Sequence, residues 1–228
     1  MLSRLWYRVR VGWHLLRAYL VTPADRPHLD RWLQTLQKDH DALLNPVPWM
    51  TYSAVARIAG ALGPESRVFE YGCGSSTLWL AARVGHLVSV EHNDHWYRRM
   101  SRELRERSVG NVDLLLRQPA YEMVAKSGGR AGHIATGADW FEEYISVIAD
   151  FPDESFDVVI VDGRSRIPCL SAARSKVKPG GLIVLDDSDR ERYHLAGDIL
   201  AEWPREDYRG IKPGLFGQHQ TSVWTKPV

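Results

Sequence analysis

The sequence predicts an α/β fold in which helices cover both faces of a doubly wound, mostly parallel sheet, with further helices at the N-terminal side. Two observations predict this fold class. Short apolar runs alternate along the chain with segments of helical periodicity. The runs are continuously apolar over four to six residues, instead of alternating with polar residues. Continuous runs are typical of parallel strands that are buried on both faces.

Length and composition describe an ordinary globular protein. The 228 residues are 44% hydrophobic and 25% charged, which disfavours global disorder. Lys and Arg total 29 against 28 Asp and Glu, and nucleic-acid binders usually carry a strong basic excess, so such a partner is not expected. Two cysteines, Cys73 and Cys169, are too few for a disulfide framework. The sequence shows no secretory signal and no apolar run of membrane-spanning length. Together with the two cysteines, this predicts a cytoplasmic protein.

Residues 1–50 are predicted to form a helical extension. Apolar residues at three-to-four spacing predict an amphipathic helix over residues 2–20. Residues 1–24 contain four Arg and no acidic residue. Three roles are open for this helix: it packs on its own domain, it contacts a second subunit as a homodimer arm, or it lies on an anionic membrane. The last role would make the predicted cytoplasmic protein a peripheral membrane protein. Prolines break the chain before and after a second predicted helix, at 28–43.

Residues 51–228 are predicted to form the main domain. A helix over 51–62 ends at Gly63-Pro64, and the stretch 49–52 before the sheet is a candidate wall of a cleft. The following elements then alternate: strand 68–71, helix 78–84, strand 87–90, helix 95–107, strand 112–116, helix 140–149, strand 156–161, helix 167–178, strand 182–185 and helix 190–203. Two last strands fit within 207–228. Residues 121–138 predict a lid, a substrate loop or a plain surface loop.

The loop after the first strand is a candidate nucleotide site. A Gly-x-Gly loop, Gly72 to Gly74, opens a helix and suits a nucleotide-like ligand. Thr77 stands where a dinucleotide fingerprint has its third glycine. Glu91 ends the next strand, about 20 residues later, where a carboxylate accepts hydrogen bonds from ribose hydroxyls. Together, the loop and Glu91 indicate a nucleoside site.

Four segments, VFEYGCGSST, SVEHN, FDVVIVDG and VKPGGLIVLDD, resemble class I S-adenosylmethionine-dependent methyltransferases over residues 51–225. The resemblance implies a seven-stranded Rossmann-like methyltransferase fold with S-adenosylmethionine as cofactor. It also implies that Glu70, Gly72 and Gly74 contact the methionine part of the cofactor, with hydroxyl contacts from Ser75, Ser76 and Thr77. By the same resemblance Glu91 holds the ribose and His92 lies beside the adenosine. Asp162 then faces the sulfonium and the substrate, as a cofactor-binding and catalytic residue.

Three carboxylates at the ends of neighbouring strands form a candidate metal site. Asp162, Asp186 and Asp187 supply the oxygen ligands that Mg²⁺ prefers. The arrangement is similar to metal-dependent O-methyltransferases of the catechol and sugar type. The match is partial, since the catechol type has a Lys base where this chain has Ser165. In the alternative, Asp187 and Ser188 cap the next helix and only Asp186 faces the cleft.

Two arginines and a histidine complete the predicted site. Arg164 and Arg166 are predicted to bind an anionic group of the substrate, or alternatively to pair with the aspartates or remain solvated. His194, in the helix after the aspartates, is a candidate general base, although a lone helical histidine is more often a surface or structural residue.

The predicted function is methyl transfer from S-adenosylmethionine to a small-molecule acceptor, at an oxygen atom. Two alternatives stay open. One is an NAD-dependent oxidoreductase, which the missing third glycine disfavours. The other is a non-catalytic nucleoside-binding protein that acts through a partner, for which the basic N-terminal helix is the candidate contact.

Overall fold

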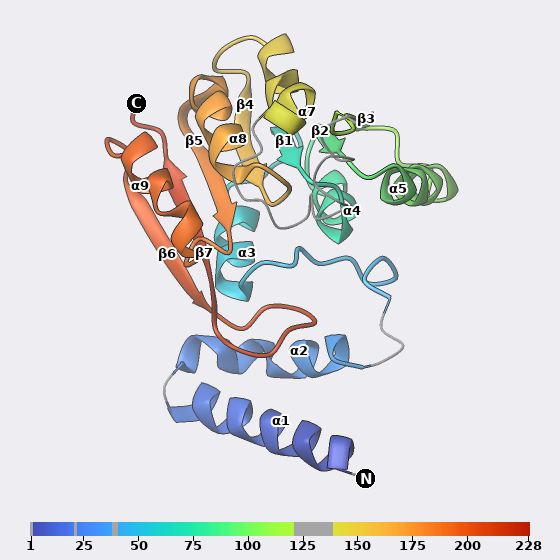
Figure 1. The fold of residues 1–228 in the computed structure, drawn as a ribbon, viewed down its shortest axis with the longest axis vertical. Helices are drawn as coiled ribbons and strands as arrows, with labels where there is room; N and C mark the ends of the chain where they lie inside the picture. Colours follow the sequence, from blue (N-terminus) through green and yellow to red (C-terminus); the bar gives the residue numbers. More distant parts are fainter. Residues whose placement is uncertain (1, 21, 38–40, 121–138) are drawn as a thin grey trace.

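The computed structural model describes residues 2–20, 22–37, 41–120 and 139–228. Within them, seven strands form one sheet in the order β3-β2-β1-β4-β5-β7-β6 (Figure 1). The strands are β1 (Arg67–Tyr71), β2 (His86–Glu91), β3 (Val112–Leu116), β4 (Phe156–Val161), β5 (Val177–Asp186), β6 (Arg205–Gly210) and β7 (His219–Thr225). The pairs among β1 to β5 are parallel, whereas β7 lies antiparallel between β5 and β6. The predicted fold class is confirmed.

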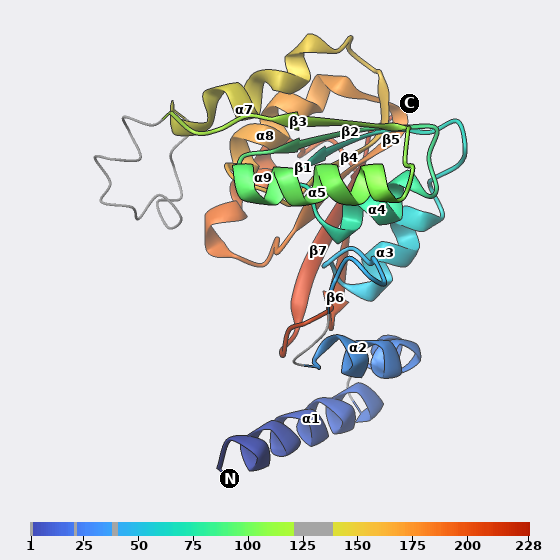
Figure 2. The same cartoon turned by 90° about the vertical axis from the view of Figure 1, so that its right-hand side faces the viewer.

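Helices cover both faces of the sheet (Figure 2). They are α1 (Leu2–Leu20), α2 (Leu29–Thr35), α3 (Tyr52–Ala59), α4 (Ser75–Ala81), α5 (Asp94–Glu106), α7 (Glu142–Ser146), α8 (Arg166–Ala173) and α9 (Leu195–Ile199), with short 3-10 helices at Pro23–His28, Asp139–Phe141, Val147–Asp150, Arg174–Lys176 and Glu191–Tyr193. Successive residues of a strand point to opposite faces. In β1, Phe69 therefore joins the core under α7, α8 and α9, while Val68 joins the core under α3 and α4.

Several element boundaries differ from the predicted ones. The predicted helices 28–43, 51–62, 167–178 and 190–203 are shorter in the structure, with 3-10 turns beside all but α3. Helix α4 begins at Ser75, directly after the glycine loop, instead of at residue 78. Residues 177–181, which lie before the predicted strand 182–185, also belong to β5, because Gly180 N donates to the Lys226 carbonyl at 2.9 Å and Lys226 N donates to the Gly181 carbonyl at 2.9 Å. A side chain on Gly181 would collide with the Asp157 carbonyl, at 2.7 Å.

The N-terminal helices lie beyond the β6–β7 end of the sheet (Figures 1 and 2). Helix α2 buries Trp32 completely, and the indole donates to the Leu215 carbonyl at 2.9 Å. The buried Asp25 carboxylate accepts the Ile211 amide at 3.1 Å, so the loop after β6 rests on this extension. The division at residue 50 stays a prediction. No helix among the described residues is long and apolar enough to cross a membrane, and the loop predicted at 121–138 lies outside the described residues.

Candidate active site

A cleft of about 650 Å³ opens at the carboxyl ends of β1, β2 and β4. This is the edge at which open parallel sheets bind their ligands. The cleft is lined by Ala42, Trp49, Gly72, Cys73, Gly74, Ser75, Ser76, Glu91, His92, Asn93, His95, Trp96, Asp162, Gly163, Arg164 and Arg166. The strand-end residues that the sequence singled out in β1, β2 and β4 therefore meet in one place.

Two glycines let the loops at the base of the cleft approach each other. Gly72 has a φ of +95°, and a Cβ there would lie 2.8 Å from the Gly163 Cα atom. A Cβ on Gly163 would in turn lie 1.9 Å from the Tyr144 hydroxyl, which belongs to a fully buried side chain. Gly72 excludes a side chain by its backbone conformation and by lack of space, and Gly163 excludes one by lack of space. The loop after β1 is thus held directly against the loop after β4.

Glu70 and Thr77 support the glycine loop from below instead of lining the cleft. Both are fully buried, and the Thr77 hydroxyl donates to the Glu70 carboxylate at 2.6 Å while it accepts the Gly74 amide at 2.9 Å. The Ser89 hydroxyl also donates to Glu70 at 2.6 Å. Burial raises the pKa of Glu70 to about 7, although nearby hydroxyls oppose the rise. Neither Glu70 nor Thr77 belongs to the lining of the cleft, and their expected cofactor contacts stay a prediction.

The serines at the start of α4 do line the cleft. Ser75 and Ser76 are both buried within its wall. The Ser75 hydroxyl donates to the Val47 carbonyl at 2.6 Å, so it also fastens the segment before the sheet to the loop.

Glu91 presents a carboxylate whose charge is held by backbone amides. Its Oε1 atom accepts the amides of His92 at 2.9 Å and Asn93 at 2.7 Å, and its Oε2 atom accepts the Cys73 amide at 3.1 Å. The His92 Nδ1 atom lies 2.8 Å from Oε1. Burial works to raise the pKa of Glu91, but His92 and these amides outweigh burial and lower it. The Glu91 carboxyl group is thus kept ionised.

Two tryptophans form walls of the cleft. The Trp96 indole, on α5, donates to the Cys73 carbonyl at 2.6 Å. Trp49 is 39% exposed, and its ring lies against the backbone of Gly214, where a Cβ would approach to 2.9 Å. The prediction for the stretch before the sheet is confirmed at Trp49. Trp96 was missed, because nothing in the helical pattern of α5 separates a cleft residue from a core residue.

The aspartates at the ends of β4 and β5 form an ionic cluster with two buried cations, Arg166 and Lys212, and with the exposed Arg190. Lys212 Nζ donates to Asp186 at 2.7 Å and to Asp187 at 2.5 Å. The Arg166 guanidinium donates to the Asp162 carboxylate at 2.7 Å and lies within 3.8 Å of both other carboxylates. The Lys212 ammonium is 4% exposed, so its charge is committed to this cluster.

The ionic cluster does not fit the predicted Mg²⁺. A divalent cation needs carboxylate oxygens that converge on one open position. Here Lys212 takes that position between Asp186 and Asp187, while the Thr221 hydroxyl donates to the other oxygen of Asp186 at 2.8 Å. Arg190 contacts Asp187 as well. In the described part of the chain, no group of three or more His, Cys, Asp or Glu is placed to hold a metal ion.

Arg166 is a structural member of the cluster. It is buried, and its guanidinium also donates to the backbone carbonyls of Gly163, Asp162 and Asp186. Its contacts with the carboxylates fit the alternative drawn from the sequence, that this arginine pairs with the aspartates, and its contact with an anionic substrate group stays a prediction. Arg164 is exposed at the cleft, with its Nε 3.5 Å from His92 Nε2.

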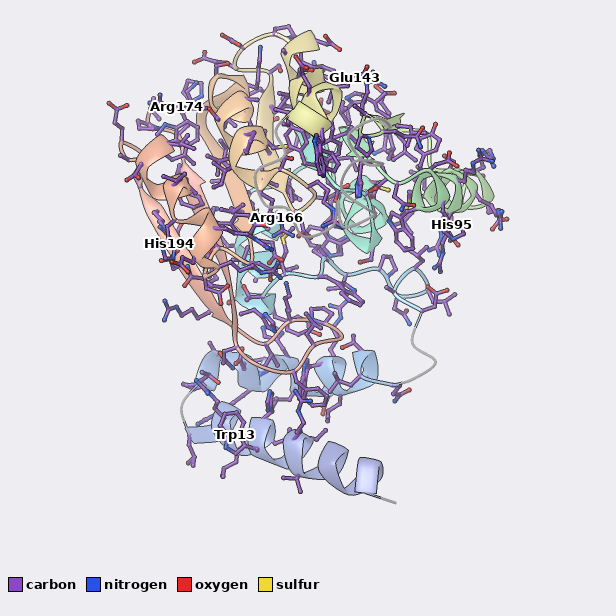
Figure 3. The ribbon with its side chains drawn as sticks, in the orientation of Figure 1. Trp13, His95, Glu143, Arg166, Arg174 and His194 are labelled. Atoms are coloured by element: carbon purple, nitrogen blue, oxygen red, sulfur yellow. The ribbon has the colours of Figure 1, made fainter. Side chains whose placement is uncertain are left out.

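His194 is not brought to the cleft. It is exposed at the beginning of α9, and it does not belong to the cleft lining. Figure 3 shows Arg166 in the middle of the molecule and His194 well to one side of it. This placement fits the alternative drawn from the sequence, a surface histidine, and a role of His194 as a base stays a prediction.

Asp162 is the titratable group that connects the cluster to the cleft. Its side chain is 23% exposed and lines the cleft, while one carboxylate oxygen is held by Arg166. Burial raises the pKa of Asp162 above its ordinary value, Arg166 opposes the rise, and the negative charges of Asp186 and Asp187 add to it. A carboxylate in this position can accept a proton from a ligand in the cleft.

A comparison with known proteins supports a family for this architecture. A family model described as a methyltransferase domain matches residues 69–188, just over half of the 228 residues. No curated protein matches the chain.

Solved structures of methyltransferases share the fold. A methyltransferase-like protein from Silicibacter pomeroyi is 22% identical, with 80% of this chain and 91% of that chain covered and a TM-score of 0.54. A precorrin-6y C5,15-methyltransferase from Geobacter metallireducens is 16% identical, with 83% of this chain and 98% of that chain covered and a TM-score of 0.53. An SAM-dependent O-methyltransferase from Thermotoga maritima is 13% identical, with 77% and 64% covered and a TM-score of 0.51. At these identities the likeness establishes the fold and leaves the acceptor open.

Proposed function

This chain belongs to the methyltransferase-domain family, as an S-adenosylmethionine-dependent methyltransferase, and we propose that it methylates a small molecule at an oxygen atom without a metal ion. Membership of this family replaces the two alternatives drawn from the sequence, an NAD-dependent oxidoreductase and a non-catalytic nucleoside-binding protein. The observation that carries the proposal is the pairing, in one cleft, of the amide-held Glu91 carboxylate with the partly exposed Asp162 carboxylate.

The residues of the cleft fit the cofactor. Glu91 is ionised, buried and directed at the cleft, as a partner for two ribose hydroxyls must be. Gly72, Gly74 and the two serines of α4 would hold the methionine part, and His92 and Trp96 would flank the adenosine. When bound, S-adenosylmethionine supplies an electrophilic methyl group on a cationic sulfur.

Asp162 is proposed to act as the general base. The acceptor hydroxyl gives its proton to the Asp162 carboxylate while its oxygen forms a bond to the methyl carbon. Bound S-adenosylmethionine would supply the methyl group, and the electron pair of its carbon–sulfur bond would remain with the departing S-adenosylhomocysteine. Arg166 orients Asp162 through the 2.7 Å contact, so the base is held in place while a second oxygen remains for the acceptor.

The cluster geometry supports metal-independent transfer. A metal ion would need the aspartates as ligands, but Lys212 and Arg166 already supply positive charge to these carboxylates. Activation of the acceptor oxygen then rests on proton removal by Asp162. The exposed Arg164, at the rim of the same cleft, favours an acceptor that carries a carboxylate or phosphate group.

The experiment is a turnover assay on the purified protein with S-adenosylmethionine and a panel of phenols, catechols and hydroxy acids, read as S-adenosylhomocysteine released. For an accepted compound, Asp162→Asn should lower kcat by roughly 10²–10⁴-fold, with cofactor affinity little changed. Asp198→Asn, at an exposed acid on α9, is the matched control.

The pH profile and a chelator complete the test. The wild-type kcat should keep rising at pH values well above the ordinary titration range of a carboxyl group. Asp162 must be ionised to accept the proton, and its pKa is raised. EDTA should leave the rate unchanged. Full activity of Asp162→Asn would reject the base, and loss of activity in EDTA that Mg²⁺ restores would reject metal independence.

A further inference from the structure

The described side chains of helix α1 form two different apolar faces, one that packs on other elements and one that is exposed. Its buried His14 ring stacks on the Trp32 ring at 5.5 Å, with an angle of 1° between the rings, and lies edge-on to Phe216 at 5.4 Å. The His14 Nε2 atom accepts the Gly217 amide at 2.6 Å. This face anchors α1 to α2 and to the loop between β6 and β7.

The other face is an exposed apolar stripe. Val9, Trp13, Leu16 and Leu20 are 56%, 53%, 58% and 73% exposed. Their spacing of four, three and four residues places them on one line along the helix. Isolated exposed apolar residues are ordinary, but four in a row on one helix indicate a binding surface. Figure 3 shows Trp13 on the outer helix of the molecule, away from the sheet.

The charges beside the stripe are all positive. Arg10 and Arg17 follow the stripe along one edge, with the Arg10 guanidinium 4.4 Å from the Phe216 ring centre and that of Arg17 5.3 Å from the Trp13 ring centre. Residues 1–24 carry four arginines and no acidic residue. The next residue, Asp25, is buried and accepts the Ile211 amide. The rest of the chain balances this local excess, because the total charge is only +1.

We propose that the stripe of α1 docks on an anionic lipid surface, with the helix lying in the plane of the interface. An apolar stripe bordered by arginines is the pattern of helices that insert at the headgroup level, and a tryptophan such as Trp13 prefers that level. A second copy is the less favoured occupant. Stripe-to-stripe pairing would bring the arginines of two helices together with no carboxylate between them.

The experiment measures binding of the full chain to two kinds of vesicle by co-sedimentation. One kind is phosphatidylcholine alone, and the other contains phosphatidylglycerol as well. Binding should require the anionic lipid and should weaken as salt is added. The double variant Leu16→Gln/Leu20→Gln should lower the partition coefficient at least ~10-fold, because two leucines no longer enter the apolar layer. Leu195→Gln, at a leucine 59% exposed on α9, is the matched control and should bind as wild type.

Two outcomes would overturn the proposal. The first is absence of binding to the anionic vesicles, or equal binding to both kinds. The second is a concentration-dependent dimer in sedimentation equilibrium that the double variant abolishes, without vesicle binding, which would assign the stripe to a second copy. Thermal melting of both variants checks the fold, which exposed substitutions should leave intact.

Discussion

Two sets of buried carboxylates stand at the same edge of the sheet and are stabilised in opposite ways. After β2, Glu91 is held by three backbone amides and lines the cleft. After β5, Asp186 and Asp187 are held by the Lys212 ammonium and the Arg166 guanidinium, outside the cleft lining. Both sets are carboxylates at the carboxyl end of a strand, but their hydrogen-bond partners differ.

The comparison separates a carboxylate that faces the cleft from carboxylates that are paired with cations. Amides are fixed by the backbone and leave the net charge of Glu91 available to a ligand. Cations cancel the charge of the aspartates, so these groups tie β4, β5 and the loop after β6 together. Asp162 stands between the two sets, because Arg166 holds one of its oxygens while its side chain still lines the cleft.

The largest expected effect comes from removing the cation. Lys212→Met leaves Asp186 and Asp187 buried without their main counter-charge and should lower the free energy of unfolding by about 4 kcal/mol at pH 8. Urea unfolding measures it. Lys178→Met, at a half-exposed ion pair with Asp157, is the matched control and should cost about 0–1 kcal/mol.

The pH dependence sharpens this prediction. Lys212 and other cations lower the pKa of Asp187 against the effect of burial, so its stabilising contribution is present above the unfolded pKa and is lost as pH falls through the folded one. The difference between wild type and Lys212→Met should therefore shrink in acid. Equal losses in the two lysine variants at pH 8 would contradict the structural assignment of the cluster.

The next effect tests the amide-held carboxylate. Glu91→Gln replaces an ionised acceptor by a neutral amide and should weaken S-adenosylmethionine binding roughly 100-fold, the equivalent of one or two charge-assisted hydrogen bonds. Titration calorimetry measures the affinity. Glu106→Gln, on the exposed side of α5, should bind as wild type. An unchanged affinity in Glu91→Gln would remove Glu91 from the cofactor site.

The smallest of these effects concerns Glu70, a buried carboxyl group whose described partners are the hydroxyls of Thr77 and Ser89. Its pKa is raised to about 7, so its contribution to stability is present below its unfolded pKa and is lost as pH rises through 7. Between pH 5 and 8 the wild type should lose about 2 kcal/mol relative to Glu70→Gln, which stays neutral. Thermal or urea unfolding at both pH values measures this difference, and parallel pH curves would show that Glu70 is ionised throughout.

Local patterns were enough for much of the molecule. The apolar runs predicted all five strands from β1 to β5, because a strand buried on both faces has to be apolar throughout. They placed Glu91 and Asp162 correctly at one cleft, because the carboxyl ends of parallel strands share an edge. Helix ends were less well predicted, since 3-10 turns and the β5 ladder depend on neighbours outside the local sequence.

By itself, the sequence determined the fold class, the glycine loop and the residues at the strand ends, because strand periodicity and turn geometry are local properties. The tertiary structure alone decided which carboxylates line the cleft and which are neutralised by cations. Lys212 lies 50 positions after Asp162 in the chain, and it reaches the cluster because β7 inserts antiparallel between β5 and β6. Charge pairing depends on distance through space, and no local pattern encodes that distance.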